Sequence, residues 1–210
     1  MRNLGALAIL LLLIPTGAYA DVVTVGNYVK FADRPGSPGG EFGLTVYNTP
    51  GGSAVDKFIT FCVQVNEYMD FTSTFVVKGV SDHSDGPTGT PLDQRTAYLY
   101  TQFRSGSLAG YNYGPNGTGN AASADLLQKA IWYFQGQISN PGSNLFVDAA
   151  NQAVNQGLWS GIGNVRVLNL FYQNGTRAQD QLTIVPEPTT LVLLTSGLAA
   201  LGLRRRRVAC

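Results

Sequence analysis

The sequence is poor in the residues on which most catalytic and metal sites depend. It holds one histidine and two cysteines among 210 residues, which excludes every metal site built on two or more histidines. Charged residues make up only 13% of the chain, and residues 21–188 carry nine Lys and Arg against 13 Asp and Glu. This acidic body lacks the basic face that nucleic-acid binding needs. We therefore expect no nucleic-acid partner.

Sequence motifs of the common enzyme classes are missing as well. No phosphate-binding loop, nucleophile elbow or dinucleotide fingerprint occurs in its proper context. The one histidine, His83, lies in a polar stretch typical of a turn, without the spacing of a nucleophile and its base. We expect neither a turnover enzyme, nor a cofactor, nor a bound metal.

The amino-terminal residues have the pattern of an export signal. Arg2 precedes a short apolar run over residues 4–14, and Ala18 and Ala20 supply the small residues of a cleavage site. The run is too short to cross a bilayer as a retained helix. We predict a signal peptide over residues 1–20, cleaved after Ala20, which makes Asp21 the new amino terminus.

The carboxyl-terminal residues combine a short motif, an apolar stretch and a basic cluster. The motif is Pro186-Glu187-Pro188, the apolar stretch covers residues 189–203, and the cluster is Arg204, Arg205, Arg206 and Arg207. A helix of this length measures about 22 Å, marginal for a hydrocarbon core of about 30 Å. Arginines directly after it would hold that end in the cytoplasm.

Residues 185–210 thus resemble the PEP-CTERM sorting signal of Gram-negative bacteria. The resemblance implies a precursor held transiently in the inner membrane by the apolar helix. It also implies an exosortase-type membrane protease as partner, removal of the tail, and delivery to the cell surface or extracellular matrix. A plain carboxyl-terminal membrane anchor is the alternative.

Between these segments, residues 21–184 are predicted to form one exported domain. Alternating apolar residues and Pro/Gly turns predict strands over residues 22–31, 41–47, 57–65, 72–78, 165–172 and 181–185. Helical spacing predicts helices over residues 92–103, 124–137 with Ser123 as N-cap, and 145–155 with Asn144 as N-cap. This order indicates an α+β fold, an antiparallel sheet or barrel with a central helical insertion.

Cys62 is the single cysteine that the exported body would keep, because Cys210 leaves with the tail. An internal disulfide is therefore excluded, and a lone thiol outside the cell is either a buried apolar group or a reactive one. Strand alternation places Cys62 on the face of Phe58 and away from Phe61 and Val63.

Gln128 is the second unusual residue, because it lies at the edge of an apolar helical stripe. The stripe consists of Leu127, Ala130, Ile131, Phe134 and Ile138. In that position its amide needs hydrogen-bond partners, unless the side chain is simply solvated.

Phe61-Cys62-Val63 and the segment 127–132 (Leu-Gln-Lys-Ala-Ile-Trp) resemble the two motifs of bacterial thioester domains, best known from Gram-positive adhesins. The family often has Thr where this chain has Leu127. The resemblance implies that Cys62 attacks the Gln128 carboxamide, expels ammonia and forms an internal thioester. An amine or hydroxyl of a surface polysaccharide or protein partner would then attack this thioester and become attached covalently. Trp132 and Tyr133 are the nearest candidates to shield it from water.

The alternative is a non-covalent structural or carbohydrate-associated matrix protein in which Cys62 is inert. In that case Tyr98, Tyr100, Tyr111 and Tyr113 could stack on sugars, although packing is the commoner role of such tyrosines.

The sorting hypothesis predicts that replacing Pro186, Glu187 and Pro188 by alanine leaves the full-length precursor in the inner membrane. Immunoblots of membrane and surface fractions would follow the processing. Shortening of the variant at the wild-type rate would contradict the exosortase assignment.

Overall fold

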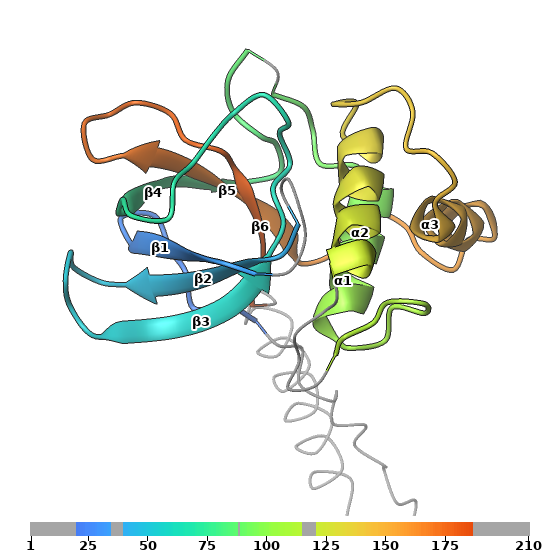
Figure 1. Cartoon of the computed structure of the whole chain (residues 1–210), viewed down its shortest axis with the longest axis horizontal. Coiled ribbons are helices and arrows are strands. Elements are labelled where there is room, and N and C mark those ends of the chain that lie inside the picture. Colours follow the sequence, from blue (N-terminus) through green and yellow to red (C-terminus); the bar gives the residue numbers. More distant parts are fainter. Residues whose placement is uncertain (1–19, 35–39, 88, 115–120, 187–210) are drawn as a thin grey trace, which may run out of the picture.

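A curled antiparallel sheet with helices along one side makes up the described residues of the computed structural model, which are 20–34, 40–87, 89–114 and 121–186 (Figure 1). The strands are β1 (Tyr28–Asp33), β2 (Phe42–Tyr47), β3 (Ala54–Thr60), β4 (Phe75–Ser81), β5 (Val165–Tyr172) and β6 (Gln181–Ile184). The helices are α1 (Gln94–Arg104), α2 (Ala121–Phe134) and α3 (Leu145–Asn155). This confirms the expected α+β class with a helical insertion between two groups of strands.

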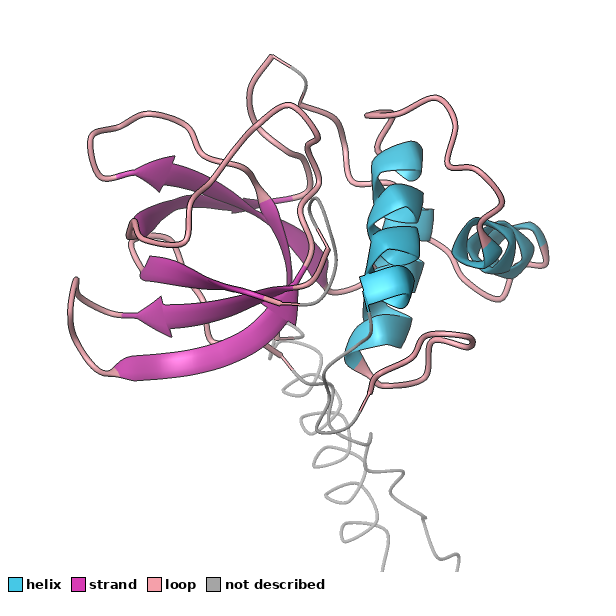
Figure 2. Ribbon diagram, viewed as in Figure 1, coloured by secondary structure: helices cyan, strands magenta, loops and turns pink. Residues whose placement is uncertain are grey.

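The two edges of the sheet approach each other where β3 ends. The strand order is β3-β2-β1-β4-β5-β6, every neighbouring pair is antiparallel, and the curl gives a half-barrel (Figure 2). Just beyond β3, Cys62 forms an isolated antiparallel bridge with Gln181 of β6. The Leu182 N–H donates to the Phe61 carbonyl at 3.1 Å. The curl therefore satisfies part of both exposed edges, which otherwise present unpaired backbone groups.

Side-chain alternation along this segment divides the apolar residues between two cores. Phe58 and Cys62 belong to the inner core, which lies within the curl and also includes Phe31, Leu44, Phe75, Val77, Trp132, Leu168 and Leu170. Phe61 and Val63 belong to the helix-side core, together with Leu127, Ile131 and Phe146. The predicted alternation is confirmed, and both faces of the segment are buried.

The helix boundaries follow their capping residues, and one predicted cap is wrong. The Asn144 side chain accepts the Phe146 N–H at 3.1 Å, as predicted. Ser123, however, lies inside α2, and its hydroxyl accepts the Asn112 N–H from a neighbouring loop. At the other end α2 stops at Phe134 because Gly136 adopts a positive φ of 67°, which reverses the chain. Ile138, predicted to extend the helical stripe, consequently packs against the inner core instead.

Three predicted strands have shifted boundaries for similar local reasons. A turn with Gly26 at φ 94° delays the first strand, which begins at Tyr28 and not at residue 22. The strand predicted over residues 57–65 starts earlier and ends at Thr60, because the chain then leaves β2 and crosses to β6. The strand predicted over residues 72–78 runs from Phe75 to Ser81.

A buried ion pair joins the start of the described chain to α1 and β6. The Asp21 carboxylate is 3% exposed and binds both terminal nitrogens of Arg104, at 2.7 and 3.0 Å. The same carboxylate accepts the Thr183 hydroxyl and the Ile184 N–H, while the Asp21 N–H donates to the Ile184 carbonyl at 2.6 Å. The residue predicted to start the exported chain is thus fixed beside the residue that precedes the sorting segment.

Replacement of Arg104 by Met is expected to lower the free energy of unfolding by roughly 3–5 kcal/mol, because the Asp21 carboxylate stays buried without its cation. Chemical denaturation monitored by tryptophan fluorescence would measure it. The exposed Lys57→Met serves as the matched control, with a change within about 0.5 kcal/mol. Equal midpoints for the two variants would contradict the role of the ion pair.

Candidate functional site

The side chains of Cys62 and Gln128 meet between the end of β3 and helix α2. The Cys62 thiol donates to Gln128 Oε1 with a sulfur–oxygen distance of 3.5 Å. The Cys62 backbone N–H donates to the same oxygen at 3.2 Å, and Gln128 Nε2 donates to the Cys62 carbonyl at 2.7 Å. Two residues that are 66 positions apart in the sequence therefore share three polar contacts.

Both members of the pair are enclosed in the fold. Cys62 is 0% exposed and Gln128 is 1% exposed. The solvated alternative for Gln128 is therefore wrong. In a dry environment the Gln128 amide needs partners, and the Cys62 thiol and backbone provide them.

The position of the pair follows from how the chain changes partners. Beyond Thr60 the chain no longer pairs with β2, whereas its other edge stays bonded to β6 through Phe61 and to Asp180, just before β6, through Val63. The Cys62 N–H and carbonyl point to the edge that β2 has left, and the Gln128 amide binds both groups. An amide side chain thus substitutes for a missing strand, since it offers one donor and one acceptor as a peptide does.

Burial decides the ionisation of the Cys62 thiol. Desolvation raises its pKa to about 12, although the Trp132 side chain and the backbone N–H groups of Cys62 and Gln64 lower the pKa. The thiol is therefore protonated at neutral pH. Any reaction at this sulfur has to move the thiol proton as part of the reaction.

The two residues expected to shield the site have different surroundings. Trp132 is 7% exposed and belongs to the same inner core as Cys62. Tyr133 is exposed, and its ring contacts Phe134. Trp132 therefore lies in the core that contains Cys62, whereas Tyr133 lies at the surface.

A row of buried polar side chains holds the segment that carries Cys62. Gln64 Oε1 accepts the Asp180 N–H at 3.0 Å, and Gln179 Nε2 donates to the Gln64 carbonyl at 2.9 Å. The Asp180 carboxylate accepts the Asp85 N–H, and burial raises its pKa to about 6 despite this bond. None of these residues belongs to a motif that the sequence suggested as a site. The sequence feature that marks them is the polar run 179–181, whose last residue begins β6.

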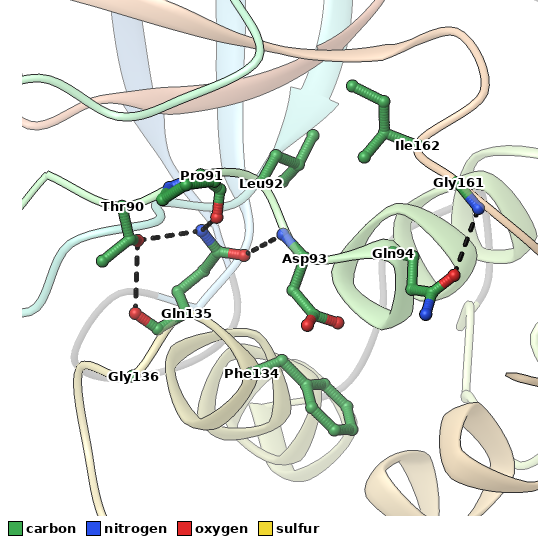
Figure 3. Close-up of a pocket in the computed structure, with 10 residues that line it drawn as sticks. All are labelled: Thr90, Pro91, Leu92, Asp93, Gln94, Phe134, Gln135, Gly136, Gly161 and Ile162. Atoms are coloured by element: carbon green, nitrogen blue, oxygen red, sulfur yellow. Dashed lines mark hydrogen bonds between the residues drawn. The ribbon is translucent and has the colours of Figure 1, made fainter.

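A separate hollow of about 570 Å³ lies between the start of α1 and the end of α2 (Figure 3). Gln135 reaches across it and bonds Thr90, Pro91 and the Asp93 N–H, as the dashed lines to Thr90 and Asp93 in Figure 3 show. Its other walls include the Phe134 ring. Gln135 is therefore a second buried glutamine, directly after α2. Unlike the amide of Gln128, its amide has no thiol among its partners.

Some predicted features fall outside this site. Among the described residues, no group of three or more His, Cys, Asp or Glu side chains is placed to hold a metal ion. None of the helices in the described ranges has the length and hydropathy needed to cross a membrane. Ala18, Glu187, Pro188 and the arginine cluster lie outside the described residues, as does the predicted sorting helix.

Comparison with protein families identifies the PEP-CTERM protein-sorting motif at residues 185–207. The protein is therefore an exported protein, made as a membrane-anchored precursor, processed by an exosortase and sorted to the cell surface. The matched residues include Pro186-Glu187-Pro188 and all four arginines of the basic cluster that follows the apolar stretch. No curated protein and no solved structure matches the chain, so the resemblance of its body to thioester domains remains an interpretation of two short motifs.

The hydrogen bonds between the Gln128 amide and the Cys62 backbone should stabilise the folded protein even without a covalent link. In a Cys62→Ala background, Gln128→Met is expected to lower the free energy of unfolding by about 2–6 kcal/mol, since the N–H and carbonyl of residue 62 both lose their partners and each costs about 1–3 kcal/mol. Urea denaturation measures the difference. A loss below about 1 kcal/mol would show that the amide does not support this backbone.

Proposed function

We propose that Cys62 and Gln128 form an internal thioester through which this surface-sorted protein attaches covalently to a partner. The observation that carries the proposal is the contact of the Cys62 thiol with the Gln128 carboxamide inside the fold. In the coupling reaction the sulfur bonds to the amide carbon, the carbon–nitrogen bond breaks, and the thiol proton leaves with the nitrogen as ammonia.

Proximity supports this reaction, because an amide is a weak electrophile. The hydrogen bond from Nε2 to the Cys62 carbonyl fixes the plane of the amide beside the sulfur. Holding two reacting groups in contact can be worth roughly 7–11 kcal/mol of the barrier. The sulfur contacts Oε1 at 3.5 Å, and this oxygen is bonded to the carbon that the sulfur would attack.

A donor is also in place for the charge that would develop on the amide oxygen. Addition of sulfur to the carbon makes Oε1 an oxyanion, and the Cys62 N–H already donates to this atom at 3.2 Å. Such a fixed donor costs no rearrangement at the moment of reaction. The sequence alone did not indicate which donor would have this role.

The high pKa of the thiol shows that this core disfavours an ionised sulfur, whereas the protonated thiol and a thioester are both neutral. A buried thiolate is unfavourable in this core, and burial raises the pKa of Cys62 to about 12. A thioester is neutral and has no such desolvation cost. It would also remove a lone thiol from an oxidising exterior, where thiols are prone to exchange and oxidation.

In the attachment reaction, a primary amine or a hydroxyl of the partner would bond to the carbonyl carbon of residue 128. The carbon–sulfur bond breaks, the Cys62 thiol takes up a proton, and an amide or ester links the two molecules. Each protein molecule reacts once, so this activity is covalent binding and not turnover. Because both residues are buried, the partner has to reach them through local opening of the fold.

A purely structural role is the second candidate, because the Gln128 amide completes the hydrogen bonds of the Cys62 backbone. This role fits a non-covalent matrix protein with an inert cysteine. The two candidates differ in the mass of the protein, since only the thioester requires loss of ammonia.

The thioester predicts an intact mass about 17 Da below that of the sequence, and covalent addition of methylamine that restores a free Cys62 thiol. Mass spectrometry of the exported protein measures both. Cys62→Ala and Gln128→Ala should each abolish the loss and the addition.

Gln135→Ala is the matched control, since this buried glutamine does not contact the thiol and the variant should keep the loss of ammonia. Loss of ammonia at Asn174-Gly175 would give the same mass, but it would persist in Cys62→Ala. A wild-type protein of full mass that does not react with methylamine would contradict the thioester, and the structural role would be the one that stands.

A further inference from the structure

Four buried side-chain atoms among the described residues have no hydrogen-bond partner, and two of them flank Cys62. They are Nε1 of Trp132 and Oε1 of Gln181, whereas the other two, Arg95 Nε and Thr96 Oγ1, belong to α1. Trp132 follows Gln128 by one helical turn, and Gln181 is the bridge partner of Cys62. Two of the four unpaired atoms thus belong to residues next to the Cys62–Gln128 pair.

Such atoms are costly and call for an explanation. A buried donor without a partner costs about 1–3 kcal/mol, and folded proteins hold few of them. Replacing the indole of Trp132 by an apolar ring would avoid that cost. An unpaired donor beside a reacting group is explained if the donor serves a state that exists only during the reaction.

The Trp132 indole shares the inner core with Cys62 and acts on its sulfur. Both side chains lie in the inner core, and the indole N–H favours the thiolate, which lowers the pKa of Cys62 against the larger effect of burial. The N–H does not reach the geometry of a hydrogen bond in the resting protein. Its attraction to the sulfur therefore grows only as negative charge develops there.

We propose that Trp132 is a catalytic residue of thioester formation, whose indole N–H stabilises the negative charge that develops on Cys62 Sγ. This inference rests on the thioester proposed above and identifies a second donor for it. The Cys62 N–H stabilises the charge on the amide oxygen, and the Trp132 N–H stabilises the charge on the sulfur. Meanwhile the proton of the Cys62 thiol passes to the departing Gln128 nitrogen.

The dry interior makes this contribution large. A hydrogen bond to an ionised acceptor is roughly twice as strong as a neutral one, and low polarity strengthens it further. Loss of one fixed donor from a reacting site typically slows the reaction by about 10²–10³. The inner core already holds the indole ring, so only a short approach of its N–H to the charged sulfur is needed during the reaction.

Re-formation of the thioester tests the proposal in the full-length chain. Ammonia attacks the thioester, regenerates the Gln128 amide and frees the Cys62 thiol, so it returns the protein to its starting state. After rapid removal of ammonia, mass spectrometry follows the renewed loss of about 17 Da with time.

Trp132→Phe keeps an aromatic ring and removes the N–H, and it should slow the reaction at least about tenfold. Tyr133→Phe, on the exposed neighbour, should react at the wild-type rate. The benzothienyl analogue of tryptophan at position 132 keeps the indole shape without its N–H, and it should be slow even if Trp132→Phe fails to fold.

The outcomes separate the two proposals. A wild-type protein that never loses ammonia contradicts the thioester itself. A wild-type protein that loses ammonia, together with a benzothienyl variant that reacts at the same rate, contradicts the role of the Trp132 N–H and leaves the thioester standing.

Discussion

The bond between the Gln128 amide and the backbone of Cys62 is the constraint on which the rest of this structure depends. Where the chain leaves β2 and crosses to β6, Cys62 would otherwise hold an unpaired N–H and carbonyl in a dry interior. Helix α2 supplies both partners from one side chain, at 3.2 and 2.7 Å. The same two bonds tie helix α2 to the segment that follows β3 and bring a carboxamide into contact with the only cysteine of the exported body.

The architecture also connects this site to export. The Asp21 N–H donates to the Ile184 carbonyl, so the two ends of the exported body lie side by side. The sorting motif begins at residue 185, directly after β6, and the bridge from Cys62 reaches the first residue of that strand. One short strand therefore closes the sheet, supports the cysteine segment and leads into the sorting segment.

Much of the fold could be predicted because it follows local rules. Alternation separated Cys62 from Phe61, and the capping preference of Asn144 located the start of α3. The errors came from interactions between distant residues. The end of β3 depends on β6, more than a hundred residues later, and the hydroxyl of Ser123 is taken by a loop. The proximity of Cys62 and Gln128 was predicted from resemblance to a family. The Trp132 donor and the Asp21–Arg104 pair became visible only in the three-dimensional structure.

A crystal structure of the exported protein, prepared without amines or ammonia, would show whether the bond between Cys62 and Gln128 forms. We expect continuous density between Cys62 Sγ and the carboxamide carbon of Gln128, at the length of a carbon–sulfur bond and with no side-chain nitrogen at residue 128. Separate density for an intact amide and a thiol in non-bonded contact would contradict it, and the pair would then serve only to hold helix α2 on the sheet.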